Sequence, residues 1–315
     1  MKKVFYLIIS LLLFAFEPLA AQRVNERYPV ISYWDFKYSD SVDSVDCRYT
    51  VNHKLFLSGF DTDGKGTFYF AGGSPLRVSC FKGTTLQWRR KVSDTYTTRG
   101  LFRLRGDSLY LVHDRTHELI IMSKDGKGEV RHVKLATNDI FEGVMHDNYF
   151  VIRGEKTTDS TKTYDWENYK LSFFNYQGRL AWTDVTDRLY SDNMMRPMPN
   201  TPHIDEYSTD LIRYAGLFRD MHLFVDLAAK RFFLFDLNGK KIYRMIEGDL
   251  FYDVLPLSVF TDEIDQEDFF SSRESYILRG THYYYAGYKP KDNHFIVVDI
   301  DLDKIFPDAV NWYKK

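Results

Sequence analysis

Short clusters of acidic residues offer the first candidate chemistry, because neighbouring carboxylates can bind cations. Residues 61–64 (DTDG) match the start of a calcium-binding loop, but the distal bidentate Glu of an EF-hand is missing. We favour a tight turn in which Asp side chains accept bonds from backbone N–H groups. Asp299, Asp301 and Asp303 alternate, so on a strand they would share one side. We interpret them as a solvated edge rather than a cation site.

Histidine and hydroxyl residues predict no recognised catalytic or metal centre. The nine histidines are scattered, and none is paired with another at metal-ligand spacing. No nucleophile-elbow motif accompanies a Ser-His-Asp combination. We therefore expect no metal and no cofactor. Whether the protein is an enzyme stays open, with a non-catalytic role favoured.

Cys47 and Cys80 are the only cysteines in the sequence. An even number of cysteines in an exported chain permits one disulfide. Their separation is close to the length of one repeat described below, so neighbouring strands could bring them together. The alternative is that Cys80 is a small apolar core residue and Cys47 a surface thiol.

The N-terminal segment predicts export. Two lysines precede an apolar run over residues 4–16, and residues 19–22 (LAAQ) offer small side chains to a signal peptidase. The run is shorter than the roughly 20 apolar residues of a membrane span. We therefore expect a cleaved signal peptide over residues 1–22 rather than an uncleaved anchor, and no later transmembrane segment. The protein would act in the periplasm or as a secreted protein.

Composition favours strands and argues against nucleic acid as a ligand. Aromatic residues make up 17% of the sequence, and Tyr and Phe suit half-buried pleated surfaces. The net charge of −2 gives no electrostatic basis for nucleic-acid binding. No segment shows sustained helical periodicity. The expected fold class is all-β.

One unit recurs along the chain: an apolar strand, a tight turn centred on Gly, and a second strand. The copies span residues 76–92, 118–135, 169–185 and 231–246, with a degenerate copy over 294–306 in which Asp303 and Lys304 replace the Gly turn. The turn glycines are Gly83, Gly126, Gly178 and Gly239. Glycine suits these positions because such hairpin turns need a positive φ.

Two further strands precede each hairpin, which gives four antiparallel strands, A to D, per unit. The B strands are expected at residues 67–72, 108–113, 148–153, 221–226 and 281–287, and the A strands at 55–60, 100–104, 141–145, 211–218 and 275–279. Such units predict a single β-propeller over residues 23–315 with five blades, and six as the alternative. Residues 30–36 either complete the last blade or belong to a sixth.

The apolar strand, the Asp/Asn/Lys-Gly turn and the following strand resemble the NHL, TolB-like and quinoprotein-like propellers. Trp88 and Trp182 lie where quinoprotein-like blades often carry tryptophan. The sequence departs from WD-repeat propellers, because residues 34–35 (WD) occur once and without a Gly-His partner. The resemblance covers residues 50–306 and implies an exported propeller of unknown role that binds proteins, peptides or glycans. It specifies a fold and not a chemistry.

Five-bladed glycosidases are similar at residues 141–143 (FEG), where they carry an acid Glu in a Glu-Gly-Pro context on an inner strand. This chain has Val144 in place of the Pro, and the inner strand over 100–104 lacks the Asp of that family. Glycoside cleavage needs a second carboxylate, for which Asp35 is the only candidate. The alternative function is therefore a glycoside hydrolase-like enzyme with Glu142 and Asp35 as an axial pair. Otherwise Glu142 is a strand-end residue bonded to backbone or to a neighbouring Arg.

Strand geometry predicts where a binding site would lie. Because successive strands are antiparallel, the A–B and C–D turns open on one face, and the B–C loops and D–A links open on the other. The three longest irregular segments, 155–168, 187–208 and 247–274, all belong to the second group. Long loops on one rim of a rigid scaffold favour a binding surface.

These three segments contain residue types that are enriched at interfaces. The candidate binding residues are Tyr164, Trp166, Met194, Met195, Arg196, Met198, Phe269 and Phe270. The primary hypothesis is a non-catalytic propeller that binds a protein or a glycan across this face. A structural part of an envelope complex with the same interface is a further alternative, and any single side chain could instead pin its loop to the disc.

Overall fold

A computed structural model describes residues 23–24, 31–37, 57–97, 101–137, 139–140, 142–146, 148–157, 168–186, 212–219, 221–226, 231–235, 242–246, 276–289 and 294–307. Within these ranges the chain forms five antiparallel sheets and one short helix, α5 (Leu302–Ile305). The predicted all-β class is confirmed. None of the helical structure in these ranges has the length and hydrophobicity of a membrane span.

Four of the sheets are built from four consecutive strands each, paired in chain order. The first contains β3 (Leu57–Thr62), β4 (Thr67–Gly72), β5 (Leu76–Lys82) and β6 (Thr85–Ser93). The second contains β7 (Leu101–Arg105), β8 (Ser108–His113), β9 (Glu118–Ser123) and β10 (Arg131–Lys134). The third contains β11 (Glu142–Met145), β12 (Tyr149–Thr157), β13 (Asn168–Asn175) and β14 (Leu180–Thr186). The fourth contains β15 (Ile212–Phe218), β16 (Met221–Asp226), β17 (Arg231–Phe235) and β18 (Ile242–Ile246).

The fifth sheet joins the two ends of the chain. Its strands are β19 (Tyr276–Arg279), β20 (His282–Lys289), β21 (His294–Asp301), β2 (Ile31–Lys37) and β1 (Arg23–Val24), in that spatial order. Ile31 is aligned with Ile300 and Lys37 with His294, so β2 runs antiparallel to β21. Of the two alternatives for residues 30–36, the pairing of β2 with β21 agrees with the one in which they complete the last blade.

A degenerate hairpin was predicted over residues 294–306, and the prediction of its second strand is wrong. After β21 the chain turns into α5, and the Asp301 side chain accepts a bond from the Asp303 backbone N–H as an N-cap. The reason lies in the pairing of the sheet. Because β2 already occupies the place of the fourth strand, the chain that follows β21 leaves the sheet.

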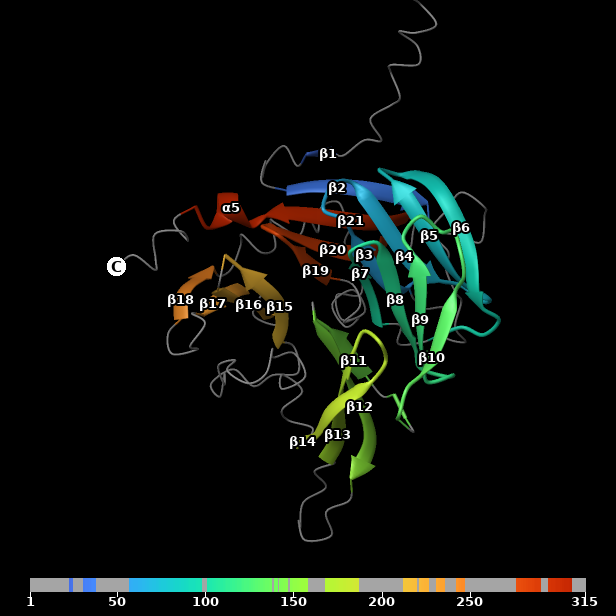
Figure 1. Ribbon diagram of the computed structural model, residues 1–315. Coiled ribbons are helices and arrows are strands. Elements are labelled where there is room, and N and C mark those ends of the chain that lie inside the picture. The colour runs from blue at the N-terminus through green and yellow to red at the C-terminus, as the bar shows by residue number, and fades with distance from the viewer. Residues whose placement is uncertain are drawn as a thin grey trace, which may run out of the picture.

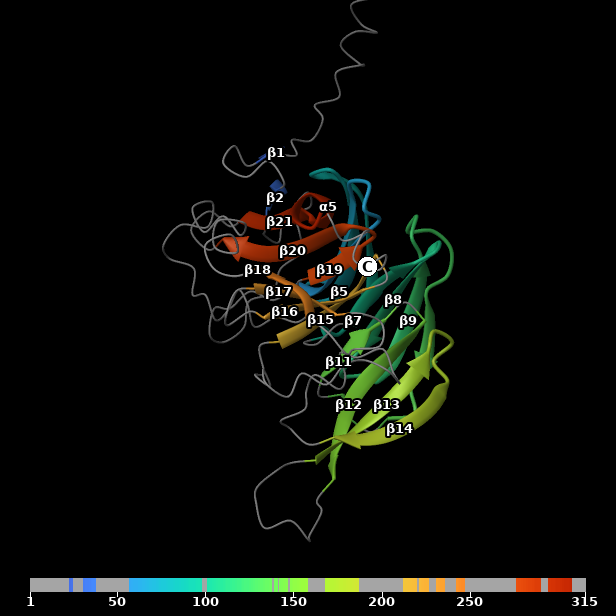
Figure 2. The same cartoon turned by 90° about the vertical axis from the view of Figure 1, so that its left-hand side faces the viewer.

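The sheets surround a common middle (Figure 1). The first strand of each sheet, β3, β7, β11, β15 or β19, lies toward the middle, and the last strand lies outside. Strand β7 contacts both β3 and β11, and β19 contacts both β3 and β15. Both views place the third sheet opposite β2 and β21 (Figure 2). This is the blade arrangement of a β-propeller; the blade number of the whole chain stays a prediction.

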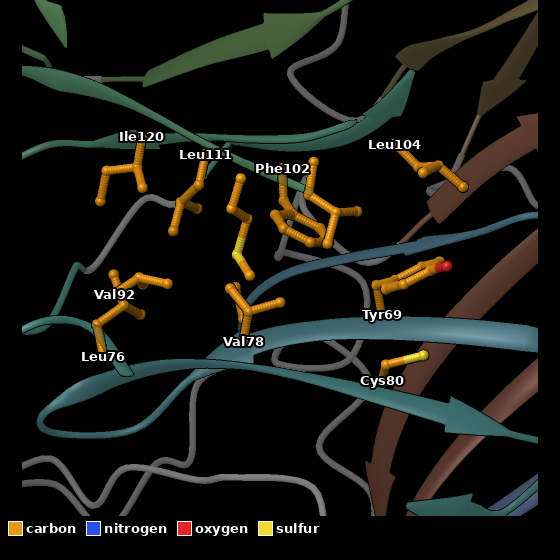
Figure 3. Close-up of a cluster of buried hydrophobic side chains, with 12 residues drawn as sticks. Tyr69, Leu76, Val78, Cys80, Val92, Phe102, Leu104, Leu111 and Ile120 are labelled. Atoms are coloured by element: carbon orange, nitrogen blue, oxygen red, sulfur yellow. The ribbon is translucent and has the colours of Figure 1, made fainter. Parts of the chain in front are cut away.

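Apolar side chains fill the spaces between neighbouring sheets. Between the first two sheets, Leu76, Val78 and Val92 face Phe102, Leu111 and Ile120 (Figure 3). Between the fifth and first sheets the cluster is largely aromatic: Trp34, Phe36, Phe60, Phe68, Phe70, Phe81, Tyr284 and Phe295. Strand β4 is buried at every residue after Thr67 because a neighbouring blade covers each of its faces. A continuous apolar strand is therefore the sequence signature of an inner blade position.

Turn glycines also provide contact points between sheets. A Cβ atom on Gly126 would lie 2.6 Å from the Trp88 ring, and one on Gly178 would lie 2.6 Å from Val133. The φ values of Gly126 and Gly178 are 75° and 77°. These glycines therefore permit the turn and also make room for the outer strand of the preceding sheet. Of the other two predicted turn glycines, Gly83 has a φ of 56° and Gly239 lies outside the described residues.

Candidate functional site

A buried ion pair gathers the ends of three inner strands. Asp61, in β3, has no exposed surface and pairs with Arg279 at the end of β19. Arg279 Nε donates to Asp61 Oδ1 at 3.1 Å, and Arg279 Nη2 donates to Leu104 O in β7 at 2.8 Å. The backbone N–H of Leu104 donates to Asp61 Oδ2 at 2.6 Å. These A strands therefore end on one side of the molecule, which we call the turn face.

A second polar cluster gathers the opposite strand ends. Ser58 Oγ, at the start of β3, donates to Thr97 O at 3.0 Å in the link between the first two sheets. Thr97 Oγ1 donates to Asp114 Oδ1 at 2.7 Å, just after β8. An A-strand start, a D–A link and a B–C loop thus meet on one side, which we call the loop face. For these sheets the predicted division into two faces is confirmed.

The predicted binding residues belong to connections of the loop-face type. The segments run from β12 to β13, from β14 to β15 and from β18 to β19, which are one B–C loop and two D–A links. The residues themselves lie outside the described part of the chain: Tyr164, Trp166, Met194, Met195, Arg196, Met198, Phe269 and Phe270. Their role in binding stays a prediction.

The prediction that Glu142 and Asp35 form an axial pair of carboxylates is wrong, because Asp35 does not lie on an inner strand. Glu142 begins the innermost strand β11, where its backbone is aligned with Arg153. Asp35 lies in β2, three strands outward from β19 in the fifth sheet. With neighbouring strands spaced by about 4.8 Å, Asp35 is about 14 Å from the inner strand of its own sheet. The pair cannot flank one glycosidic bond, because the N-terminal strand is added at the outer edge of the sheet.

The DTDG segment divides into a turn residue and a buried residue. Asp63 Oδ1 accepts bonds from the backbone N–H groups of Lys65 at 2.7 Å and Thr67 at 3.0 Å, as the turn interpretation predicts. Asp61 instead lies at the meeting point of three sheets, a role that the sequence analysis missed. Its partner Arg279 is more than 200 positions away, so no local spacing rule could have found the pair.

The alternating aspartates do not form one solvated edge. Asp299 is buried and accepts a bond from His282, while Asp301 caps α5 and Asp303 pairs with Arg219. The helix places Asp303 on a different element from Asp299, so the period of a strand does not apply to all three. Among the described residues, no three His, Cys, Asp or Glu side chains are grouped as metal ligands would be.

Cys80 carries a free thiol inside the core between the first two sheets (Figure 3). Burial raises the pKa of this thiol to about 12, which keeps it protonated and unreactive at neutral pH. This is the apolar core position that the alternative interpretation of Cys80 expected. Cys47 lies outside the described residues.

Two histidines, one on each face, have pKa values that are shifted in opposite directions. On the loop face His113 is fully buried, and burial lowers its pKa. On the turn face His282 Nδ1 lies 2.7 Å from Asp299 Oδ1, and this hydrogen bond raises the pKa of His282. Because a carboxylate only accepts hydrogen bonds, Nδ1 is the donor to Asp299. His113 Nε2 lies 3.2 Å from Thr95 Oγ1 and 3.3 Å from Thr95 O, so this histidine joins the end of β8 to the link between the first two sheets.

Comparison with known proteins adds similarity of fold. No protein-family model and no curated protein matches the chain. Similar solved structures include virginiamycin B lyase from Staphylococcus aureus, with 10% identity over 86% of this chain and 99% of that chain and a TM-score of 0.43. Glutaminyl cyclase from Myxococcus xanthus gives 9% identity over 85% and 94% with a TM-score of 0.41, and BamB from Moraxella catarrhalis gives 7% over 80% and 90% with 0.36.

These similar structures are β-propeller proteins. At such identities and TM-scores they carry no argument about the function of this chain. The propeller assignment rests on the pairing and arrangement of the sheets themselves.

Proposed function

We propose that this protein is an exported, non-catalytic propeller that binds a protein or a glycan in or beyond the cell envelope through its loop face. The observation that carries the proposal is that the strand ends lie on two separate faces. The Asp61–Arg279 contact joins strand ends on the turn face, and the Thr97–Asp114 contact joins strand ends on the loop face. All B–C and D–A connections of such a scaffold leave from the same face. The three long, aromatic- and Met-rich segments are connections of these two types.

The turn face contrasts with this surface because its connections are short. Only residues 106–107 join β7 to β8, and only 280–281 join β19 to β20. Short turns on packed strands present little adaptable surface, whereas long loops on a rigid scaffold are the usual place for recognition. The loop face is therefore the better candidate for ligand binding.

Export would be tested on the protein made from its full-length gene in its own host. N-terminal sequencing of the envelope or medium fraction is expected to begin at Arg23, as for a signal peptide over residues 1–22. A product that retains the apolar run would contradict the export part of the proposal and leave the binding part to be tested separately.

Ligand binding would be tested by co-purification from the native envelope together with a glycan array. Trp166→Ala is expected to weaken capture of the recovered ligand at least tenfold, because aromatic anchors dominate interface energies. Trp182→Ala is the matched control, since Trp182 is 43% exposed on the outer strand β14 and belongs to no loop-face connection. Equal affinity of the Trp166 variant and the wild type would count against the loop face as the binding surface.

A further inference from the structure

An arginine and a tyrosine form a stacked pair on the described part of the loop face. Tyr96 lies in the link between the first two sheets, and Arg115 lies in the loop between β8 and β9. The guanidinium carbon of Arg115 is 3.6 Å from the centre of the Tyr96 ring, and Arg115 Nη2 also donates a hydrogen bond to the Tyr96 hydroxyl. Arg115 is solvent-exposed although its guanidinium is held in place.

The loop that carries Arg115 is fixed by hydrogen bonds on both sides. The backbone N–H of Thr116 donates to His113 Nδ1 at 3.3 Å, and Lys134 Nζ donates to Thr116 O at 2.5 Å. The backbone N–H of Leu135 donates to His117 O at 2.9 Å. Because the loop is already ordered, a ligand that binds Arg115 would lose little of its binding energy to ordering of the loop.

Two carboxylates lie near Arg115, and each bonds to another residue. Asp114 is buried and accepts the bond from Thr97, and Glu118 lies 3.2 Å from His132. Within the described ranges Arg115 forms no ion pair. The exposed ammonium group of Lys134, bonded to the same loop, adds a second positive charge. Arg115 and Lys134 are the exposed charged groups here, whereas Asp114 is buried and Glu118 is partly buried, so the outer surface of the loop suits an anionic group on a ligand.

We propose that the Tyr96–Arg115 pair is a contact point for a carboxylate of an acidic protein segment. This inference rests on the proposed function, because it names the partner chemistry for one part of the loop face. Arginine presents N–H groups in a planar fork that matches the geometry of a carboxylate. The ring contact and the hydrogen bond to Tyr96 hold this guanidinium in place. Arg and Tyr are also two of the residue types that most often dominate protein–protein interfaces.

A protein segment fits the pair better than a sugar ring does. Recognition of a sugar by an aromatic residue uses a bare ring face, and here the guanidinium covers one face of the half-buried Tyr96 ring. What the pair presents outward is a positive charge with directional donors. Side-chain carboxylates of Asp and Glu meet this requirement, and uronic-acid glycans become the alternative that the experiment must exclude.

The test measures fluorescence anisotropy of a labelled peptide of alternating Glu and Gly with the mature protein at low salt. Wild-type protein is expected to bind the peptide, with affinity that falls as salt rises. Arg115→Glu should weaken binding about tenfold or more, and Arg115→Lys should lie between, because lysine lacks the planar fork. Lys127→Glu is the control, since Lys127 is exposed in the β9–β10 turn and makes the same charge change on the turn face.

Four results would overturn the inference. They are no peptide binding by the wild type, equal weakening by Lys127→Glu, no weakening by Arg115→Glu, and Arg115-dependent binding of oligogalacturonate without binding of the peptide. The last result would assign the pair to an acidic glycan. If Trp166→Ala abolishes capture of the native ligand while Arg115→Glu leaves both capture and peptide binding unchanged, this inference fails and the proposed function stands. If neither variant alters capture, the proposed function fails as well.

Discussion

The turn face and the loop face differ in what holds the sheets together. On the turn face, the buried Asp61–Arg279 ion pair links three sheets, and Trp88 packs over Gly126 of the next sheet. On the loop face, the sheets are linked by neutral or single-charge hydrogen bonds such as those from Ser58 to Thr97 and from Thr97 to Asp114. The turn face therefore carries contacts that tolerate little change.

This difference indicates how one scaffold can combine a stable turn face with a loop face whose sequence can vary. Contacts that depend on exact charge pairing and close packing are concentrated where the connections are short. On the loop face, the bonds beneath the connections come from small hydroxyl residues such as Ser58 and Thr97. We infer that changes at the turn-face contacts cost more folding stability than changes at the exposed part of the loop face.

The largest expected effect comes from Asp61→Ala. Removing one partner of a buried ion pair leaves the other uncompensated, which typically costs about 3–5 kcal/mol. The variant would also leave the backbone N–H of Leu104 without its acceptor. We expect urea denaturation to show a loss of this size in the free energy of unfolding.

Asp63→Ala provides the matched control for Asp61→Ala. Asp63 lies in the turn that directly follows β3 and accepts two backbone bonds, but it is partly exposed and forms no link to another sheet in the described residues. Its loss should cost only about 1 kcal/mol. Equal destabilisation by the two variants would show that the turn itself, and not the junction of three sheets, is the stabilising element.

A smaller effect is expected from Gly126→Ala, measured against Gly128→Ala. Both glycines have a φ close to 75° in the same turn, so both substitutions carry the conformational penalty of about 1 kcal/mol. Only at Gly126 would the new methyl group meet the Trp88 ring; at Gly128 nothing lies within 4 Å. Gly126→Ala should therefore cost a further 1–3 kcal/mol or so from overpacking. Equal melting temperatures of the two variants would contradict the role of Trp88 in joining the sheets.

Sequence patterns predicted the local elements well because those elements depend on neighbouring residues. Apolar strands and Gly-centred turns gave the hairpins β5–β6 and β9–β10 close to their observed bounds. The two faces followed from antiparallel geometry alone. The prediction was wrong at residues 302–306, although the local sequence pattern there resembles a hairpin. The fourth strand of that sheet is β2, which comes from the other end of the chain.

The contacts at the site could not be predicted because they join distant residues. Asp61 contacts Arg279 because β19 of the fifth sheet packs beside β3 of the first. Arg115 contacts Tyr96 because the second sheet packs against the first. Asp35 was assigned to the axis because its sequence position does not reveal that β2 is an outer strand. The periodicity of apolar residues and the type of turn predict individual strands. They do not predict which strand ends contact each other in the folded protein.

The smallest expected effect is a pH response of opposite sign at the two faces. Because its bond to Asp299 raises the pKa of His282, the resulting stability is fully present below the unfolded pKa of about 6.5 and is lost as pH rises through the folded value. Because burial lowers the pKa of His113, its neutral form contributes stability above about pH 6.5 that is lost as pH falls through the folded value. Acidification should thus strengthen the turn face and weaken the loop face.

Urea denaturation of His282→Gln and His113→Gln across a pH series would separate these contributions. Relative to each variant, the wild type should gain stability through His282 and lose it through His113 as the pH falls from about 8 to about 5. The His282 side chain is 38% exposed, so solvent screening should hold its effect below about 1 kcal/mol. Parallel pH dependence in the two variants would contradict the contrast between the faces, because it would mean that both imidazoles experience the same environment.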